Sequence, residues 1–321
     1  MRGIFGYEGA NHTFEHNAKG FVFAPFAIGK KIFIPAEESA KLAESFESMD
    51  SGNPLNDEPQ TSHHTKAAFE ALVSKSVEAI NSGQFEKLVC SRPEEITVVN
   101  INAVSVFKKM LKAYPNAFCY CFFSPETGLW MGATPEQLLK VKNGILNTVA
   151  LAGTQVYNAG KAAEWPDKER QEQQFVTDYI VDKLSNFVSD MQVTQPYTFR
   201  AGNIVHIKTD ISATIQNTET LHNIINALHP TPAVCGLPKE QAQQFLIEHE
   251  GYSREYYSGY LGEINMGAVS NQTDLFVNLR CMKIEGNKVT LYVGCGITKD
   301  SDPEKEFFET VNKSMTMRRV L

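Results

Sequence analysis

The stretch DLFVNLRCMKIEGNKVTLYVGCGIT, residues 274–298, decides the fold class of this chain. Two runs rich in Val, Leu, Phe and Tyr flank Gly286-Asn287, and such runs separated by turn residues are typical of neighbouring β-strands. The same pattern recurs at residues 117–125 and 128–134, where SPETG supplies the turn. Long strands joined by short turns, with helices in separate runs, indicate an α+β fold with large antiparallel sheets.

The helices are predicted from apolar residues at helical spacing. In the stretch 65–83, Phe69, Leu72 and Ile80 recur with this period, and Gly83 ends the run. Three more stretches are predicted to be helical: 103–115, about 166–190 and the segment that begins near 302. We find no internal repeat, low-complexity tract or linker, so we predict one domain over residues 1–321.

The composition argues against several function classes. The chain of 321 residues is 42% hydrophobic and 21% charged, which is ordinary for a globular protein, and its formal net charge is −7. Because the basic residues are not clustered, nucleic acid is not an expected partner. No run approaches the roughly 18 to 20 apolar residues of a membrane span, and residues 1–16 show no signal-peptide pattern, so no membrane association is expected.

The six cysteines lie mostly in apolar, strand-like runs. The only close pair, Cys119 and Cys121, lacks the C-x-x-C spacing of zinc and redox sites. Reduced, buried cysteines are typical of an intracellular protein, so we expect a cytoplasmic location.

Lys87 directly precedes a short apolar run in the sequence. The segment EKLVCSRPEE, residues 86–95, follows a loop and is predicted to be a strand. Side chains alternate along a strand, so Lys87 points away from the face that carries Leu88 and Cys90. The segment alone leaves two interpretations open: a solvated lysine on an outer face, and an amine held inside a site.

Glu136 lies in GATPEQLL, where Thr134, Pro135 and Gln137 match the N-cap, N1 and N3 positions of a helix. This pattern predicts a helix that starts here, with Glu136 in its first turn. Because the helix dipole favours an acid in that position, the simplest interpretation of this glutamate is structural.

Glu172 and Glu309 are candidate metal ligands on two predicted helices. Glu172 precedes Phe175 and Val176 by three and four residues, so it is expected to continue a buried face, where an ionised carboxylate needs a partner, a metal or water. Glu309 shares a helix face with charged residues three before and four after it, which is typical of a solvated face. Mg²⁺ takes a few carboxylates plus water and a substrate oxygen, so the fold would have to bring these two residues together.

Ordered motifs over residues 85–321 resemble those of the chorismate-utilising enzymes, the group of isochorismate, anthranilate, aminodeoxychorismate and salicylate synthases. The motifs occur in the family's order: KLVCSR, GATPEQLL, ALAGTQ, DKERQEQQFV, HPTPAVCGLP, REYYSGYLGEI, FVNLRCMKI, LYVGCGI and EFFETVNK. Residues 1–84 carry no motif that we can place, and they would form a shortened N-terminal part of a single chorismate-binding domain. The resemblance implies a sandwich of large antiparallel β-sheets with helices on the outside.

The resemblance also implies a site for chorismate and Mg²⁺. Lys87 corresponds to the general base that activates water for attack at C2, and Glu136 to the acid that protonates the departing C4 hydroxyl. Glu172 and Glu309 match the magnesium ligands, with Glu306 beside them. The remaining matches are to groups around the substrate: His206, Ala233, Arg280, Tyr292, Gly294, Gly296 and Lys313.

The loop Thr231-Pro232-Ala233 and the lysine at position 87 point to one member of the group. By resemblance, isochorismate synthases typically have Thr-Pro-Ala here, whereas the enzymes that use ammonia and the salicylate synthases usually have Gly-Thr or Gly-Ser. The expected function is therefore reversible isomerisation of chorismate to isochorismate, with no glutaminase subunit. One residue departs from the family pattern, since Gln173 stands where a histidine often follows the metal glutamate.

Two alternatives stay open from the sequence. A salicylate synthase would add pyruvate elimination in the same pocket, and a non-catalytic relative would only bind chorismate. The matched acid and base speak against mere binding, because a binding protein needs neither. The sequence does not indicate whether isochorismate would serve menaquinone or siderophore synthesis, nor the oligomeric state.

Overall fold

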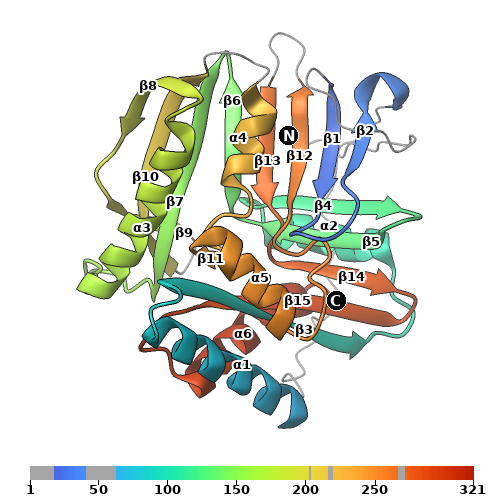
Figure 1. The fold of residues 1–321 in the computed structure, drawn as a ribbon. Helices are drawn as coiled ribbons and strands as arrows, with labels where there is room; N and C mark the ends of the chain where they lie inside the picture. The colour runs from blue at the N-terminus through green and yellow to red at the C-terminus, as the bar shows by residue number, and fades with distance from the viewer. Residues whose placement is uncertain (1–17, 41–62, 202–203, 216–219, 267–271) are drawn as a thin grey trace.

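Two antiparallel β-sheets form the centre of the molecule, and their strands run in steeply crossing directions (Figure 1). The computed structural model describes residues 18–40, 63–201, 204–215, 220–266 and 272–321. The N-terminal stretch 1–16, in which we expect no signal peptide, lies outside these residues. Within the described residues, one sheet has nine strands and the other has six.

The larger sheet has the order β2-β1-β12-β13-β6-β7-β10-β8, with β9 paired to β10. Its strands are β1 (Gly20–Ala24), β2 (Ile32–Pro35), β6 (Gln137–Lys142), β7 (Ile145–Val156), β8 (Val188–Val193), β9 (Tyr197–Ala201), β10 (Ile204–Ile215), β12 (Tyr260–Met266) and β13 (Gln272–Val277). Helices α3 (Asp167–Leu184) and α4 (Leu221–Leu228) cover one face of it (Figure 1).

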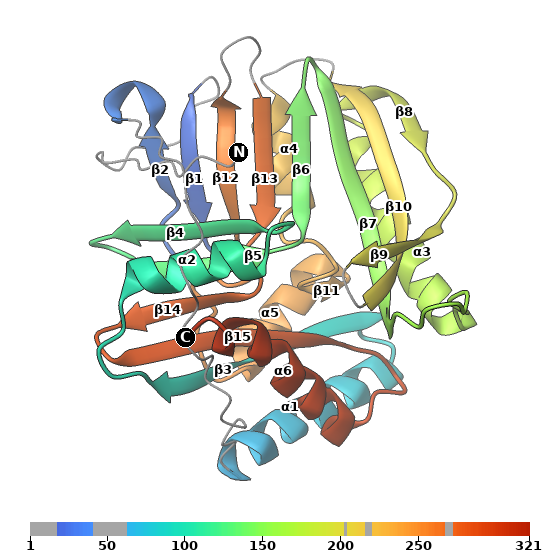
Figure 2. The same ribbon diagram turned by 180° about the vertical axis from the view of Figure 1, so that it is seen from behind.

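The smaller sheet has the order β11-β3-β15-β14-β5-β4. Its strands are β3 (Lys87–Thr97), β4 (Phe118–Ser124), β5 (Gly128–Thr134), β11 (Gly236–Leu237), β14 (Cys281–Glu285) and β15 (Lys288–Ile297). Four helices pack on it, as the reverse view also shows (Figure 2): α1 (His63–Asn81), α2 (Ala103–Ala113), α5 (Lys239–His249) and α6 (Pro303–Arg318). The predicted sandwich of large antiparallel sheets with outer helices is therefore confirmed.

An aromatic layer joins the two sheets. Phe23 of β1 lies 4.4 Å from Phe122 of β4 and 6.0 Å from Trp130 of β5, measured between ring centroids. Phe118 and Phe276 stack across the same boundary at 4.3 Å. Burying such large rings supplies much of the stabilisation that holds the sheets together, at roughly 25 cal/mol per Å² of apolar surface removed from water.

At two adjacent places the chain passes from one sheet to the other with only two or three residues between the strands. It crosses between β5 and β6 at residues 135–136, and between β13 and β14 at residues 278–280. Backbone bonds tie the crossings together, because Val277 N donates to Glu136 O at 2.9 Å and Ala133 N donates to Arg280 O at 3.0 Å. The predicted helix at residue 136 and the predicted single strand over 274–285 are both wrong for this reason.

Two other predictions about secondary structure need correction. The helix predicted to reach residue 190 ends at Leu184, and β8 begins at Val188. On this helix Val176 is buried as expected, but Phe175 is 41% exposed. Glu172 therefore lies at the edge of the buried face, and Gln173 takes the fully buried position instead.

None of the six cysteines forms a disulfide bond, and four of them are buried as predicted. Cys119 is partly buried and Cys121 is exposed on β4. In the described part of the chain no helix is both long and apolar enough to cross a membrane.

Candidate active site

Lys87 is the first residue of β3, and its side chain is only 11% exposed. Its Nζ lies 3.8 Å from Glu172 Oε2, so the small sheet contacts α3 at this point. On the neighbouring strand β15, a Cβ built at Gly296 would come 3.1 Å from Lys87 Cε. The glycine thus leaves the space that the lysine stem occupies, while Leu88 and Cys90 pack toward the helices on the other face.

Glu136 and Arg280 lie in these two short crossings between the sheets. Arg280 adopts a positive φ of 48°, which turns the chain from β13 into β14. Thr134 Oγ1 donates to Val277 O at 2.6 Å, so this hydroxyl bonds across the crossing and caps no helix. The sequence predicted Glu136 in a helix and Arg280 inside a strand. In the structure both residues lie in neighbouring crossings between the sheets.

Burial raises the pKa of the Glu136 carboxyl from 4.5 to about 7. The positive charges of Lys87, Arg280 and Lys313 oppose this rise without cancelling it. No hydrogen bond or ion pair joins this carboxyl to another side chain among the described residues. Glu136 is thus a carboxylic acid that keeps its proton up to about neutral pH, within reach of three cationic groups.

Lys313 links α6 to β15. Its Nζ donates to Gly294 O at 2.9 Å and lies 2.6 Å from Glu309 Oε1, one helical turn away. Glu306 lies a further turn toward the helix start, and burial raises the pKa of its carboxyl, with a smaller contribution from Glu309. Lys313, Glu309 and Glu306 therefore form a charged row along the helix next to the glycines of β15.

His206 lies on β10 of the larger sheet. Its Nδ1 lies 2.8 Å from Gly153 O. Burial lowers the pKa of its imidazole, and the charges of Arg280 and Lys313 lower it further. Because the same two cations act on Glu136 and on His206, these four groups belong to one cluster.

Ala233 lies in the loop between α4 and β11, beside a small cavity that also borders Glu136, Leu151, Val176 and Thr231. The Thr231 hydroxyl is buried and has no hydrogen-bond partner in the described part of the structure. The loop that distinguishes members of the resembled family thus adjoins the acid at the crossing.

Tyr292 is placed differently from the other predicted substrate contacts. Its ring stacks on Trp130 at 5.1 Å in the aromatic layer, and its hydroxyl donates to Glu255 Oε1 at 3.3 Å. Glu255 in turn pairs with Lys283 at 2.9 Å. These contacts account for Tyr292 as a core residue, so the structure does not bring its hydroxyl to the charged cluster.

Comparison with known proteins decides the family. The model of the family described as "Chorismate binding enzyme" matches residues 28–321 of this chain. The chain belongs to this family. Its fold and the order of its motifs agree with that membership. The matched range also includes residues 28–84, where the sequence showed no motif that we could place.

Two curated relatives are similar over most of the chain. The isochorismate synthase MenF of Escherichia coli K12 is 31% identical over 267 residues, which cover 80% of this chain and 60% of the relative. The salicylate biosynthesis isochorismate synthase of Pseudomonas aeruginosa is 29% identical over 280 residues, covering 84% and 58%. The chain therefore spans about three fifths of the length of these relatives.

Solved structures share the fold. The solved structure of MenF, the menaquinone-specific isochorismate synthase of E. coli, superposes with a TM-score of 0.76 at 24% identity, covering 95% of this chain and 79% of that one. The predicted chorismate-utilising fold is thus confirmed.

Two further residues belong to the site on structural grounds. Glu169 lies one turn before Glu172 on α3, and its Oε2 is buried without a partner in the described residues. A Cβ at Gly294 would come 2.9 Å from the Tyr257 hydroxyl, so this tyrosine stands against the same glycine that Lys313 contacts. Glu169 could have been found from the sequence, because it lies three residues before Glu172 and so on the same helix face. Nothing in the sequence marks Tyr257, and not Tyr256, as a residue of the site.

The carboxylates suit a hard cation such as Mg²⁺, which prefers oxygen ligands. Glu172 lies on α3 and Glu309 on α6, and the orphaned oxygen of Glu169 provides a further donor that lacks a partner. Within the described residues no three acidic, histidine or cysteine side chains are close enough to hold a metal by themselves. Mg²⁺ often takes part of its coordination from water and substrate oxygens, so a few carboxylates are the ligands that the chain itself would have to supply.

Proposed function

We propose that this chain is an isochorismate synthase, which converts chorismate reversibly to isochorismate in the presence of Mg²⁺. The observation that carries the proposal is the opposed pair of Lys87 and Glu136. A partly buried lysine and a carboxylic acid with a pKa of about 7 lie in one charged cluster. The relatives named isochorismate synthase support the same reaction.

In the proposed reaction, water adds at C2 while the C4 hydroxyl leaves as water and the ring double bonds shift. Lys87 takes a proton from the attacking water, and Glu136 gives its proton to the departing hydroxyl. A pKa of about 7 keeps Glu136 protonated where an exposed glutamate would be ionised. Since one water enters and one leaves, substrate and product are isomers.

Arg280 and Lys313 are the cations proposed to hold the substrate carboxylates, together with the backbone of β15 at Gly294 and Gly296. Both side chains act electrostatically on Glu136 and His206, so they present positive charge beside the proposed acid. Glu172 and Glu309, with Glu306 and Glu169 beside them, would hold Mg²⁺. When bound, the metal would neutralise and orient the ring carboxylate.

Ala233 supports hydroxylation over the reactions of other family members. Its methyl group leaves room beside the ring for water, whereas a threonine would place a hydroxyl and a methyl there. Because water and not ammonia would be the nucleophile, no glutaminase subunit is expected.

The proposal is tested by incubating the purified protein with chorismate, with and without Mg²⁺, and separating the products by chromatography. Isochorismate that forms only with the metal is the expected result. Salicylate and pyruvate would instead identify a salicylate synthase. Chorismate binding without any turnover in a well-folded sample would contradict the enzymatic proposal and favour a binding protein.

A further inference from the structure

The strand that carries Lys87 loses its neighbour shortly after that residue. The partner strand β11 is only two residues long, and Gly236 and Leu237 pair with Leu88 and Lys87. One more backbone bond follows, from Val89 N to Cys235 O at 2.9 Å. Beyond this point the loop that carries Ala233 turns away, so the next polar groups on this edge of β3 need other partners.

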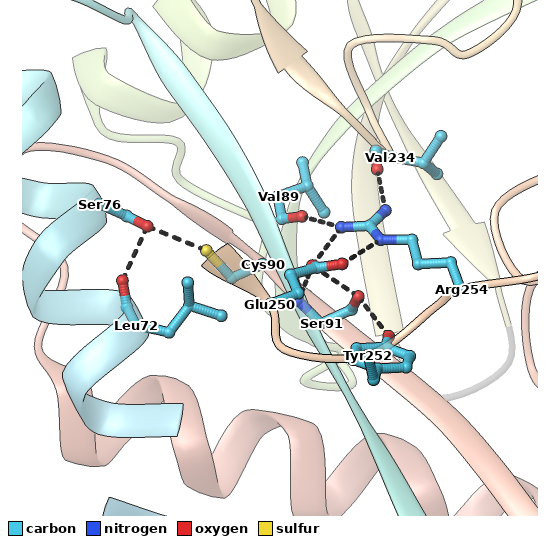
Figure 3. Close-up of polar contacts among 9 residues, drawn as sticks. All are labelled: Leu72, Ser76, Val89, Cys90, Ser91, Val234, Glu250, Tyr252 and Arg254. Atoms are coloured by element: carbon cyan, nitrogen blue, oxygen red, sulfur yellow. Dashed lines mark hydrogen bonds and ion pairs between the residues drawn. The ribbon is translucent and has the colours of Figure 1, made fainter. Parts of the chain in front are cut away.

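Two charged side chains take the place of the missing strand (Figure 3). Arg254 Nη2 donates to Val89 O at 2.6 Å, and Glu250 Oε1 accepts from Ser91 N at 2.8 Å. A carbonyl and an N–H two residues apart are the groups that a paired strand would have bonded. The ion pair therefore continues the ladder where the backbone cannot.

The same guanidinium also holds the loop. Arg254 Nη1 donates to Val234 O at 2.8 Å, the carbonyl immediately after Ala233. Val89 lies two residues after Lys87 on the same face of β3. One rigid, planar group is thus bonded both to the strand of the proposed base and to the loop of the proposed water site.

Arg254 is itself fixed from several sides. Glu250 accepts from Arg254 Nε at 2.7 Å and from Nη2 at 2.6 Å, a bidentate pair whose side chains are 2% and 3% exposed. The guanidinium also lies 4.3 Å from the ring centroid of Phe26. Because these contacts fix the position of the guanidinium, β3 and the loop that carries Ala233 can move little relative to each other.

We propose that Arg254, held by Glu250, is a positioning residue that sets the distance between Lys87 and the Ala233 loop. This inference rests on the proposed function for its effect on catalysis, and on the hydrogen bonds alone for its effect on local structure. An arginine is required because its fork donates in two directions at once, whereas a lysine cannot hold both carbonyls and both carboxylate oxygens.

The test compares Arg254→Lys with Arg318→Lys. Arg318 is the matched control, because its Nε donates to buried Glu94 at 2.6 Å near the far end of the same strand. This bond involves neither residues 86–91 nor residues 231–237. Thermal unfolding, kcat and KM for chorismate, and hydrogen exchange of peptides covering 86–91 and 231–237 are measured for each variant. Exchange is measured without substrate, so it tests the clamp even if the wild type converts no chorismate.

Arg254→Lys is expected to lower kcat about tenfold or more while KM changes less, since misplacing a catalytic group acts mainly on the chemical step. Exchange should become faster in both peptides together. Arg318→Lys should lower the unfolding temperature but leave kcat and both peptides near wild type. If Arg254→Lys fails to fold, Glu250→Gln gives the same comparison with the guanidinium retained. Unchanged exchange in both peptides, or an equal loss of kcat in Arg318→Lys, would overturn the proposal.

Discussion

The aromatic layer between the sheets and the charged site beside it are both largely buried, but they differ in how their polar atoms are bonded. In the aromatic layer, Trp130 Nε1 donates to Thr127 O at 3.0 Å and the Tyr120 hydroxyl donates to Asn278 Oδ1 at 2.7 Å. In the site, the Glu136 carboxyl has no such partner within the described part of the chain, and oxygens of Glu169 and Thr231 are buried there without one. Buried polar groups that are bonded locally contribute to stability, whereas groups left unbonded are candidates for contact with a ligand.

Lys87→Ala should give the largest effect that separates the two regions. If Lys87 is the base, kcat should fall about 10²- to 10⁴-fold, while the unfolding temperature stays near that of the wild type. Lys283→Ala is a matched control, because Lys283 is similarly buried at 15% exposure and pairs with Glu255 outside the charged cluster. The kcat values are measured from product formation. Similar values for the two variants would contradict the role of Lys87 as general base.

Trp130→Ala should produce the opposite pattern. Removing this fully buried ring is expected to cost about 3 to 5 kcal/mol of unfolding free energy, because its cavity can collapse only in part. Urea unfolding measures this loss, and kcat per folded molecule should change little. A variant that is as stable as the wild type but inactive would show that the aromatic layer affects catalysis directly.

Glu136→Gln should remove a pH dependence from both activity and stability. Since the acid must be protonated, wild-type kcat for isochorismate formation should fall as the pH rises through about 7. The folded pKa is raised above 4.5, so its contribution to stability is fully present below pH 4.5 and is lost as the pH rises through about 7. Glutamine cannot ionise, so this variant should show a lower, flatter rate and no such slope in unfolding free energy. A wild-type rate that is flat across neutral pH would contradict the assignment.

Ala233→Thr should have a smaller effect, confined to the reaction. The added hydroxyl and methyl would occupy the space beside the ring, so isochorismate formation is expected to drop on the order of tenfold while the unfolding temperature is kept. Ala233→Ser separates volume from polarity, since it adds only the hydroxyl. An unchanged rate of isochorismate formation in Ala233→Thr would contradict the proposal that Ala233 leaves space for the attacking water.

Regular elements could be predicted from the sequence wherever a local pattern determines them. The turn Gly286-Asn287 joins β14 to β15 as expected, with Gly286 at a φ of 63°. The crossings between sheets could not be predicted in this way. Residues 274–285 alternate without any glycine or proline, yet the chain bends at Arg280, because the residues on either side pair with different sheets.

Glu136 shows why a local signal can mislead. Thr-Pro-Glu-Gln is a sound helix start, but Thr134 finds its partner at Val277, more than a hundred residues away, and Gln137 begins a strand. The site residues themselves came from the resemblance to a family, since no spacing in the sequence brings Lys87 to Glu172 or to Gly296. Tertiary contacts alone create that cluster, and they also add Glu169 and Tyr257, which the sequence did not single out.

In the proposed reaction, water activated by Lys87 attacks the substrate ring. Running the reaction with Mg²⁺ in water labelled with heavy oxygen, and weighing the isochorismate formed in early turnover, tests this most directly. We expect one heavy oxygen in each product molecule, and product formation by Lys87→Ala that is slower by about 10²- to 10⁴-fold. Product that carries no label would mean that the hydroxyl migrates within the substrate, and it would contradict the roles assigned to Lys87 and Ala233.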